Sequence, residues 1–272
     1  MNDNSVNSTE AQQAKTFSVL TWNIEGIKSG VFVLKKILEQ KIPDMVFLSE
    51  PSIFQPDLPN ILKYLNGEYC SFLNSDDLYD QELPLIRNFS VGGTLCLWKK
   101  WLDPYIKVHA APSSSFTPVI LKLPNYQTSI HIGVYLPTHG KDTQFVSDLA
   151  DLRICLEELC EAYPDALLFI RGDANVNQKN RTRVALLESF LLDFHLTSVH
   201  ILHKTYHHFV GNGAFDSNVD ILVHSTGISF PESVNEILCK NEHPLLSHHD
   251  IIMSQFSLPA QPTSAAKLDV CT

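Results

Sequence analysis

The chain has 272 residues, 44% apolar and 18% charged, which is enough apolar material for a sizeable core and excludes a fully disordered protein. No apolar run approaches the ~18–20 residues of a membrane span, and the polar start lacks the features of a secretory signal. The formal net charge of −10 is opposite in sign to that of proteins that hold nucleic acid by counterion release, so chemistry on a polyanion would need a bridging cation. The six cysteines form no CxxC pair and fit free thiols in a reducing compartment. We therefore expect an intracellular protein, nuclear or cytoplasmic and not secreted.

Two tails and one domain describe the organisation of the chain. Residues 1–15 are polar and residues 257–272 are rich in Pro, Ala and Ser, so we expect both to be disordered and residues 16–256 to form a single domain. Apolar spacing and turn residues predict, in chain order, strand 17–22, helix 29–41, strands 45–49, 92–98, 118–123 and 129–136, a helix with its apolar stripe at 145–160, strand 166–173, helix 181–194, and two closing strands, 204–209 and 218–225, around a Gly-Asn-Gly turn. This mixture indicates an α/β domain in which helices cover sheets.

Polar side chains collect where the expected strands end. Asn23 and Glu25 follow the first strand, and Glu50 follows the second. If the helix between them is a right-handed crossover, the two strands are parallel and both ends reach the same edge of a sheet. Ligands bind at that edge in open α/β sheets, so it is the default site. Later strand ends and the closing loop add Tyr135, Asp173, Asn175, Asn177, Asp220, His248, His249 and Asp250.

Each of these residues also has a structural interpretation. An Asn or Asp after a strand is more often a turn former than a catalyst, and a lone Tyr135 is most often a core or rim residue. Asp220 is harder to explain in this way, because an apolar strand seldom buries a carboxylate without a partner. The occurrence of all these residues in this order therefore carries more information than any one of them.

Six segments carry a family resemblance when they are read in order. They are WNIEG (22–26), SEP (49–51), YLPTHG (135–140), RGDANVN (171–177), SNVDILVHS (217–225) and SHHDII (247–252). Together they resemble the endonuclease/exonuclease/phosphatase superfamily over about residues 16–256. The segment TYHHFVGNGAFDSNVDILVHS (205–225) is most similar in style to the endonuclease domains of non-LTR retrotransposons. The resemblance implies a four-layer α/β sandwich, in which two packed mixed β-sheets are flanked by helices.

The resemblance also implies roles for individual residues. Glu50 would hold the metal ion, with Glu25 and Asn23 close to it, and Mg²⁺ is the expected cofactor, with Mn²⁺ as an alternative. An all-oxygen donor set suits Mg²⁺, which keeps several waters and also bridges an acidic protein to a phosphate. Asp173 would activate the attacking water and Asn175 would orient it. His249, oriented by Asp220, would contact the scissile phosphate, and Tyr135 would contact the phosphate or the leaving oxygen. Asn23 would be a further catalytic residue, and the substrate would be bound by Thr205, Tyr206 and Asn177.

The sequence departs from the family pattern at two positions. Ser49 replaces a residue that is usually Gln, which is a secondary difference. His248 stands where the usual Ser-Asp-His has its second essential carboxylate, and imidazole supplies no anionic oxygen. Asp250 is close in sequence, although successive strand residues point to opposite faces. Because the constellation is otherwise complete, we expect an irregular loop to turn Asp250 inward and compensate.

Three functions are consistent with these features. The leading hypothesis is a Mg²⁺-dependent phosphodiesterase, most simply a DNA endonuclease of retrotransposon type that acts as a monomer. The acidic charge also allows a phosphatase or phosphodiesterase for a small phosphoester, which needs no basic track. The third, motivated by His248, is a catalytically decayed domain of the same fold that retains only binding.

Overall fold

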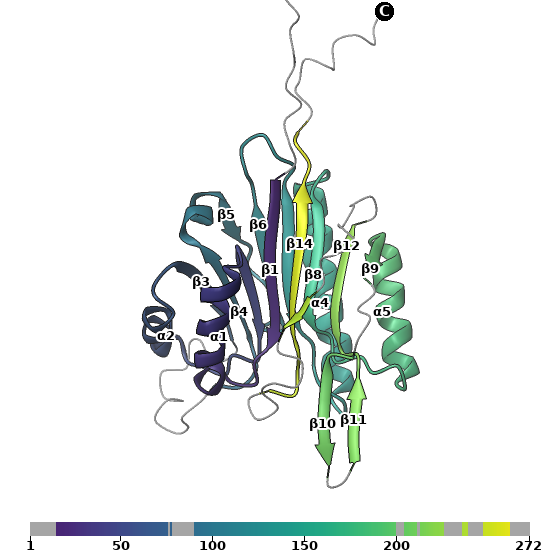
Figure 1. The fold of residues 1–272 in the computed structure, drawn as a ribbon. Coiled ribbons are helices and arrows are strands. Elements are labelled where there is room, and N and C mark those ends of the chain that lie inside the picture. Colours follow the sequence, from purple (N-terminus) through teal and green to yellow (C-terminus); the bar gives the residue numbers. More distant parts are fainter. Residues whose placement is uncertain are drawn as a thin grey trace, which may run out of the picture.

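A computed structural model describes residues 15–75, 77, 90–199, 204–210, 213–225, 236–238 and 247–261, and the predicted tails lie mostly outside these residues. Two six-stranded mixed sheets pack face to face, and helices cover both outer faces (Figure 1). This arrangement confirms the predicted α/β fold class and its four layers. No helix in the described part of the chain is long and apolar enough to cross a bilayer.

The first sheet has the strand order β13-β14-β1-β2-β4-β3 and the second the order β5-β6-β7-β8-β12-β9. The strands of the first sheet are β1 (Lys15–Asn23), β2 (Met45–Ser49), β3 (Tyr69–Asn74), β4 (Thr94–Lys99), β13 (Glu236–Leu238) and β14 (Ile251–Leu258). Those of the second sheet are β5 (Ile106–Val108), β6 (Phe116–Leu121), β7 (Ser129–Tyr135), β8 (Leu167–Asp173), β9 (Leu196–Ser198) and β12 (Asp220–Ser225). The helices are α1 (Ile27–Lys41), α2 (Leu58–Tyr64), α4 (Asp142–Ala162) and α5 (Arg181–Asp193), with 3₁₀ turns at Gln55–Asp57 and Lys100–Tyr105.

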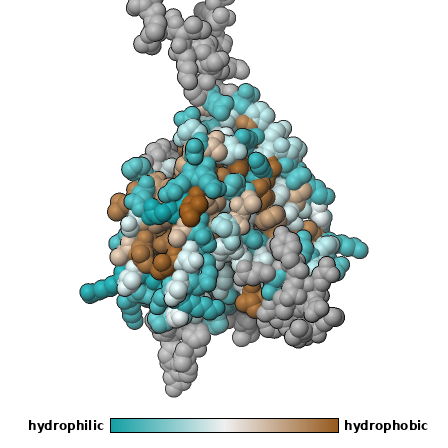
Figure 2. Space-filling model, turned by 180° about the vertical axis from the view of Figure 1, so that it is seen from behind, coloured by the Kyte–Doolittle hydropathy of each residue, from teal (hydrophilic) through white to brown (hydrophobic). Residues whose placement is uncertain are grey.

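Among the described residues, three large apolar cores hold the four layers together. The apolar stripe of α1, including Leu34 and Ile37, packs on the first sheet, and that of α4, including Phe145 and Leu152, packs on the second. A third core, which includes Phe169, fills the space between the sheets. The face opposite to that in Figure 1 is mostly hydrophilic with separate apolar patches (Figure 2).

The strand registers bring the predicted polar positions to one edge. β1 pairs in parallel with β2, so that Asn23 lies opposite Ser49, and the chain continues to Glu50. In the second sheet β7 pairs in parallel with β8, and Tyr135 lies opposite Asp173. The parallel pairing expected for the first two strands is therefore confirmed, and the second sheet repeats it.

Strands form in both predicted closing segments, 204–209 and 218–225, but they do not pair with each other. β10 (Tyr206–Val210) pairs with β11 (Gly213–Ser217) in a separate two-stranded sheet that projects from the body (Figure 1). β12 instead joins the second sheet between β8 and β9. The physical reason is burial, since the apolar side chains of β12, such as the fully buried Val223, belong to the core under α4 and α5. The domain also extends slightly past its predicted bounds, because β1 begins at Lys15 and β14 ends at Leu258.

Candidate active site

The candidate site lies at the edge of the two sheets, where the apolar core between them ends. Asn23 closes β1 with the same side-chain direction as the core residue Val19, and Asp173 closes β8 with that of Phe169. The Asn23 amide Nδ2 donates to Asp173 Oδ2 at 2.9 Å and to Glu50 Oε2 at 3.0 Å. One buried amide thus joins carboxylates from both sheets.

Left-handed backbone conformations gather at this edge. Glu25, Glu50 and Asn175 have φ values of 46°, 50° and 52°, which non-glycine residues seldom adopt. Gly172 has a φ of 129°, and a Cβ atom there would lie 2.2 Å from the Val134 carbonyl oxygen. These backbone conformations are strained. Such strain persists only where the surrounding structure enforces it, and strained residues cluster at functional sites.

Asp173 is the most enclosed carboxylate of the site, with 1% of its surface exposed. Besides the Asn23 contact, it accepts hydrogen bonds from the Asn175 backbone N–H at 2.8 Å and from Asn175 Nδ2 at 3.0 Å. Burial raises the pKa of Asp173 above its usual range, while the neighbouring His249 lowers it in part. A carboxylate with a raised pKa is a better proton acceptor from water, which suits a general base.

His249 and Asp220 form a buried pair beside Asp173. His249 Nδ1 lies 3.1 Å from Asp220 Oδ2, and His249 Nε2 lies 3.7 Å from Asp173 Oδ2. Burial by itself lowers the pKa of His249, but the Asp220 carboxylate outweighs it and brings this pKa to about 9. At neutral pH the imidazole is therefore protonated and can donate to an anionic oxygen.

Tyr135 connects the second sheet to Glu50. Its hydroxyl donates a hydrogen bond to Glu50 Oε1. Burial raises the pKa of Tyr135 strongly, and the Glu50 charge raises it further, so the phenol stays neutral. The hydroxyl therefore acts as a donor that orients Glu50, and its predicted contact with the phosphate stays a prediction.

The three predicted substrate-binding residues lie in different environments. Tyr206 stands at the site, where its ring centre lies 4.9 Å from that of His249 in an edge-to-face arrangement. Thr205 is fully buried, and its Oγ1 lies 3.5 Å from Asn218 Oδ1, so this structure offers no Thr205 surface to a substrate. Asn177 Oδ1 accepts from the Lys179 backbone N–H at 2.9 Å, which is the contact of a turn former.

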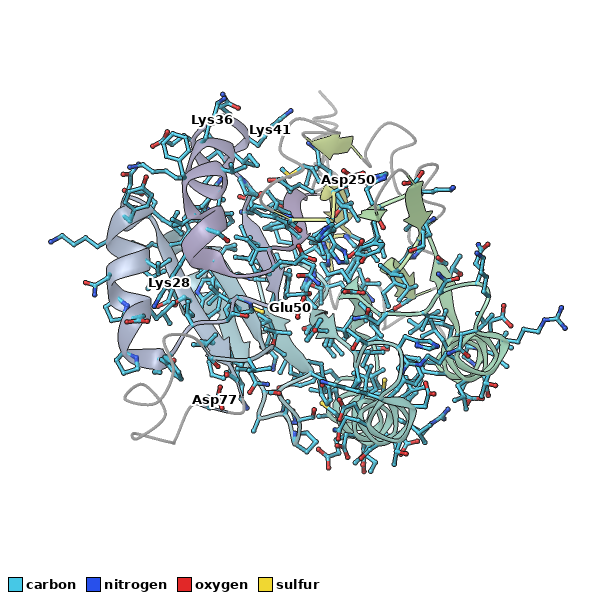
Figure 3. The ribbon with its side chains drawn as sticks, turned by 90° about the horizontal axis from the view of Figure 1, so that it is seen from below. Lys28, Lys36, Lys41, Glu50, Asp77 and Asp250 are labelled. Atoms are coloured by element: carbon cyan, nitrogen blue, oxygen red, sulfur yellow. The ribbon has the colours of Figure 1, made fainter. Side chains whose placement is uncertain are left out.

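The expectation that Asp250 compensates for His248 is wrong. Asp250 Oδ2 lies 3.0 Å from His207 Nε2, and Figure 3 shows Asp250 to one side of Glu50. The place beside Glu25 is taken by His248, whose Nδ1 lies 3.0 Å and 3.1 Å from the two Glu25 carboxylate oxygens. The strand β14 begins directly after Asp250, which fixes the side to which its carboxylate turns.

The donor set at this edge fits a hydrated hard cation. Within the described residues, no cluster of three or more His, Cys, Asp or Glu side chains could cage a metal. Mg²⁺ needs only one or two carboxylates and keeps several waters, and Glu50 is only partly buried, with lone pairs beyond its two hydrogen bonds. Asn23 turns its N–H₂ group toward Glu50, while its Oδ1 accepts from the Glu25 backbone N–H at 3.1 Å. The donors that fit the ion are thus Glu50 and Glu25, and the orientation of Asn23 does not support its prediction as a ligand.

Sequence reasoning missed two residues that shape the site. Ser247 Oγ donates to the Asn23 carbonyl oxygen at 2.6 Å and accepts from the His249 backbone N–H at 3.0 Å, which ties the closing loop to β1. Arg183, the third residue of α5, is buried and donates to the Asn175 carbonyl oxygen in the loop that follows Asp173. A signal for Arg183 was present, because it shares the helical stripe of Leu187 and Phe190, where a charged residue is unexpected.

No protein-family model matches the sequence, and no curated protein matches it significantly. Solved structures do match its fold. A 3′ phosphatase, NExo, from Neisseria, bound to a product DNA hairpin, has a TM-score of 0.67 and 15% identity over 88% of this chain and 99% of its own. The AP endonuclease LMAP from Leishmania major has a TM-score of 0.66 and 13% identity over 91% and 89%. The endonuclease domain of TRAS1, a telomere-specific non-LTR retrotransposon, has a TM-score of 0.62 and 14% identity over 90% and 100%. The chain therefore has the fold of the endonuclease/exonuclease/phosphatase superfamily, as the six sequence segments predict.

Proposed function

We propose that the chain is a divalent-cation-dependent phosphodiesterase that cleaves DNA, an endonuclease of retrotransposon type. The observation that carries this proposal is the joining of Asp173 and Glu50 by the Asn23 amide, beside a protonated His249. A general base, an oxygen donor for a cation and a cationic hydrogen-bond donor thus lie at one edge. These are the groups that hydrolysis of a phosphodiester requires.

Asp173 would accept a proton from the attacking water, and the Asn175 amide would orient it. The water oxygen bonds to phosphorus, the bond from phosphorus to the leaving sugar oxygen breaks, and that oxygen takes up a proton from solvent. His249, kept protonated and oriented by Asp220, would donate to a non-bridging phosphate oxygen as its negative charge increases. A Mg²⁺ ion, or Mn²⁺, held through Glu50 and Glu25 would neutralise part of the same charge.

DNA is the proposed substrate because the Neisseria phosphatase with the same fold was solved with a product DNA hairpin, and TDP2 from D. rerio, which also has this fold, was solved with a single-stranded DNA product. We also propose that the protein acts as a monomer inside the cell, in the nucleus or the cytoplasm. A specific observation favours a second candidate. The net charge of −10 suits a small phosphoester, which needs no extended basic surface.

A substrate panel tests the proposal and separates it from its alternatives. Purified protein is incubated with supercoiled plasmid and with bis(p-nitrophenyl) phosphate, each in Mg²⁺, Mn²⁺ or EDTA. We expect nicking of the plasmid that requires the cation. Turnover of the small ester without nicking would replace DNA with a small substrate, and DNA binding without turnover of either compound would favour the decayed domain.

A further inference from the structure

Arg183 is a buried arginine that connects the two loops on which site residues lie. It belongs to α5, and only 2% of its side chain is exposed. Its guanidinium donates from Nη2 to the Thr138 carbonyl at 2.8 Å and from Nη1 to the carbonyls of Pro137 at 2.5 Å and Asn175 at 3.2 Å. Nε donates to Asp142 Oδ1 at 2.7 Å. Four oxygens from three segments therefore meet at one side chain.

Two of these segments lead directly into the candidate site. The carbonyls of Pro137 and Thr138 belong to the loop that follows Tyr135, and the carbonyl of Asn175 belongs to the loop that follows Asp173. The loops also touch each other, since the Leu136 backbone N–H donates to the Asp173 carbonyl at 2.9 Å. Arg183 closes this contact from the side of α5.

The backbone of Asn175 needs such support. Its φ of 52° is left-handed, while its side chain holds Asp173 and the Leu136 carbonyl at 3.0 Å and 2.8 Å. A residue in this conformation stays there only if neighbouring groups enforce it. The hydrogen bond from Arg183 to the Asn175 carbonyl fixes the peptide that follows this residue.

We propose that Arg183 is a positioning residue for the hydrolysis proposed above, on which this inference rests. It holds the backbone of Asn175 so that the Asn175 amide and Asp173 keep the geometry needed to align water. It acts through these residues and does not itself touch the reacting atoms. Placement errors of about 1 Å at such residues cost roughly 10²-fold in rate.

Arginine suits this position for a geometric reason. Its planar guanidinium presents five N–H donors in a fixed fork, whereas an ammonium group is a point charge with three donors. The Phe145 ring lies 4.4 Å from the guanidinium carbon and supports its flat face. The Asp142 side chain is 65% exposed, so solvent screens its ion pair with Arg183. The three hydrogen bonds to backbone carbonyls are therefore the contacts that set the role of Arg183.

A second arginine offers a matched control. Arg153 of α4 also pairs with an aspartate, Asp193 of α5, at 2.6 Å, and it also lies over phenylalanine rings, those of Phe190 and Phe194. It connects the same two helices as Arg183 and Asp142. Its described contacts are with helix side chains and include neither active-site loop.

The experiment compares Arg183→Lys with Arg153→Lys. Initial rates of plasmid nicking give kcat and KM, and amide hydrogen exchange is followed at Leu136 and Asn175. For Arg183→Lys we expect kcat to fall about 10–100-fold, KM to change less than about threefold, and exchange at both amides to accelerate. Arg153→Lys should leave kcat within about twofold and exchange at these amides unchanged.

The outcomes separate this inference from the proposed function. A kcat for Arg183→Lys that equals that of Arg153→Lys overturns the inference, as does unchanged exchange at Asn175. If the wild-type protein cleaves no phosphodiester, the proposed function fails, and faster exchange at Asn175 then still supports the positional restraint itself. If Arg183→Lys does not fold, Asp142→Ala takes its place, since Asp142 is exposed and its truncation removes the acceptor that holds Arg183 Nε. That variant should lower kcat by a smaller factor and accelerate the same amides, and no change in either overturns the inference.

Discussion

Replacing Asn23 by aspartate tests the central bridge of the site with almost no change in shape. The Asn23 Nδ2 group lies 3.0 Å from Glu50 Oε2 and 2.9 Å from Asp173 Oδ2, and Asn23 is 1% exposed. Hydrogen bonds to charged groups contribute about 1.5–3 kcal/mol each, so losing both costs about 3–6 kcal/mol. A third charge at about 3 Å would repel each neighbour by roughly 5 kcal/mol at an effective dielectric constant of 20. One carboxyl will therefore bind a proton, and its O–H group can restore one of the two hydrogen bonds, so the expected loss is about 1.5–6 kcal/mol.

For a domain of about this size, 1 kcal/mol corresponds to roughly 2–4 °C in Tm, so Asn23→Asp should melt roughly 3–24 °C below the wild type in metal-free buffer. Thermal unfolding followed by circular dichroism measures this difference. Asn66→Asp is the control, because Asn66 Nδ2 also donates to a glutamate, Glu39 Oε1, at 3.0 Å, but at the exposed surface. It should stay within about 2 °C of the wild type. A Tm for Asn23→Asp as close as that to the wild type would refute the bridge.

Three further predictions follow from the same contacts. Glu50→Gln should abolish the rise in Tm that Mg²⁺ gives the wild type, and an unchanged rise would show that Glu50 is not the ligand. His248→Asp should raise the rate of plasmid cleavage on the order of tenfold, because a carboxylate can hold the cation where an imidazole cannot. A tenfold rate corresponds to a barrier lower by about 1.4 kcal/mol. An unchanged or lower rate contradicts this prediction. Burial lowers the pKa of His207, but the hydrogen bonds that its imidazole donates to the carboxylates of Asp216 and Asp250 raise this pKa above its usual value. Protonated His207 therefore stabilises the folded protein. This contribution is complete below pH ~6.5, the ordinary pKa of histidine, and is lost as the pH rises through the raised pKa of His207. Tm should therefore fall more between pH 6 and 9 for the wild type than for His207→Gln, and equal slopes would exclude the contribution.

The sequence allowed the fold class and the edge of the site to be predicted, because both depend on periodicity and on strand ends. The strand at 45–49 is apolar up to Ser49 and that at 167–173 is apolar up to Ile170. The parallel strands β1 and β2 are joined by α1, so they must end at the same edge. From that geometry the approach of Asn23 to Glu50 follows without any structure.

Other features depend on contacts between segments far apart in the chain. Asp250 faces His207 because β10 runs beside the closing loop, a pairing that local patterns do not encode. The place of β12 in the second sheet was missed for the same reason. The place of Arg183 in the apolar stripe of α5 marked it as unusual, but its role could not be predicted because its acceptors are backbone carbonyls, which carry no sequence signal.

The most direct test of the account is the rate at which the wild-type protein and Asp173→Asn nick supercoiled plasmid in Mg²⁺, with both proteins shown to be folded. The account predicts nicking by the wild type that EDTA abolishes. It also predicts a loss of at least about 10²-fold in Asp173→Asn, because the general base is removed while the shape of the side chain is kept. No nicking by the wild type in Mg²⁺ or Mn²⁺, or a variant that retains most of the wild-type rate, would contradict it.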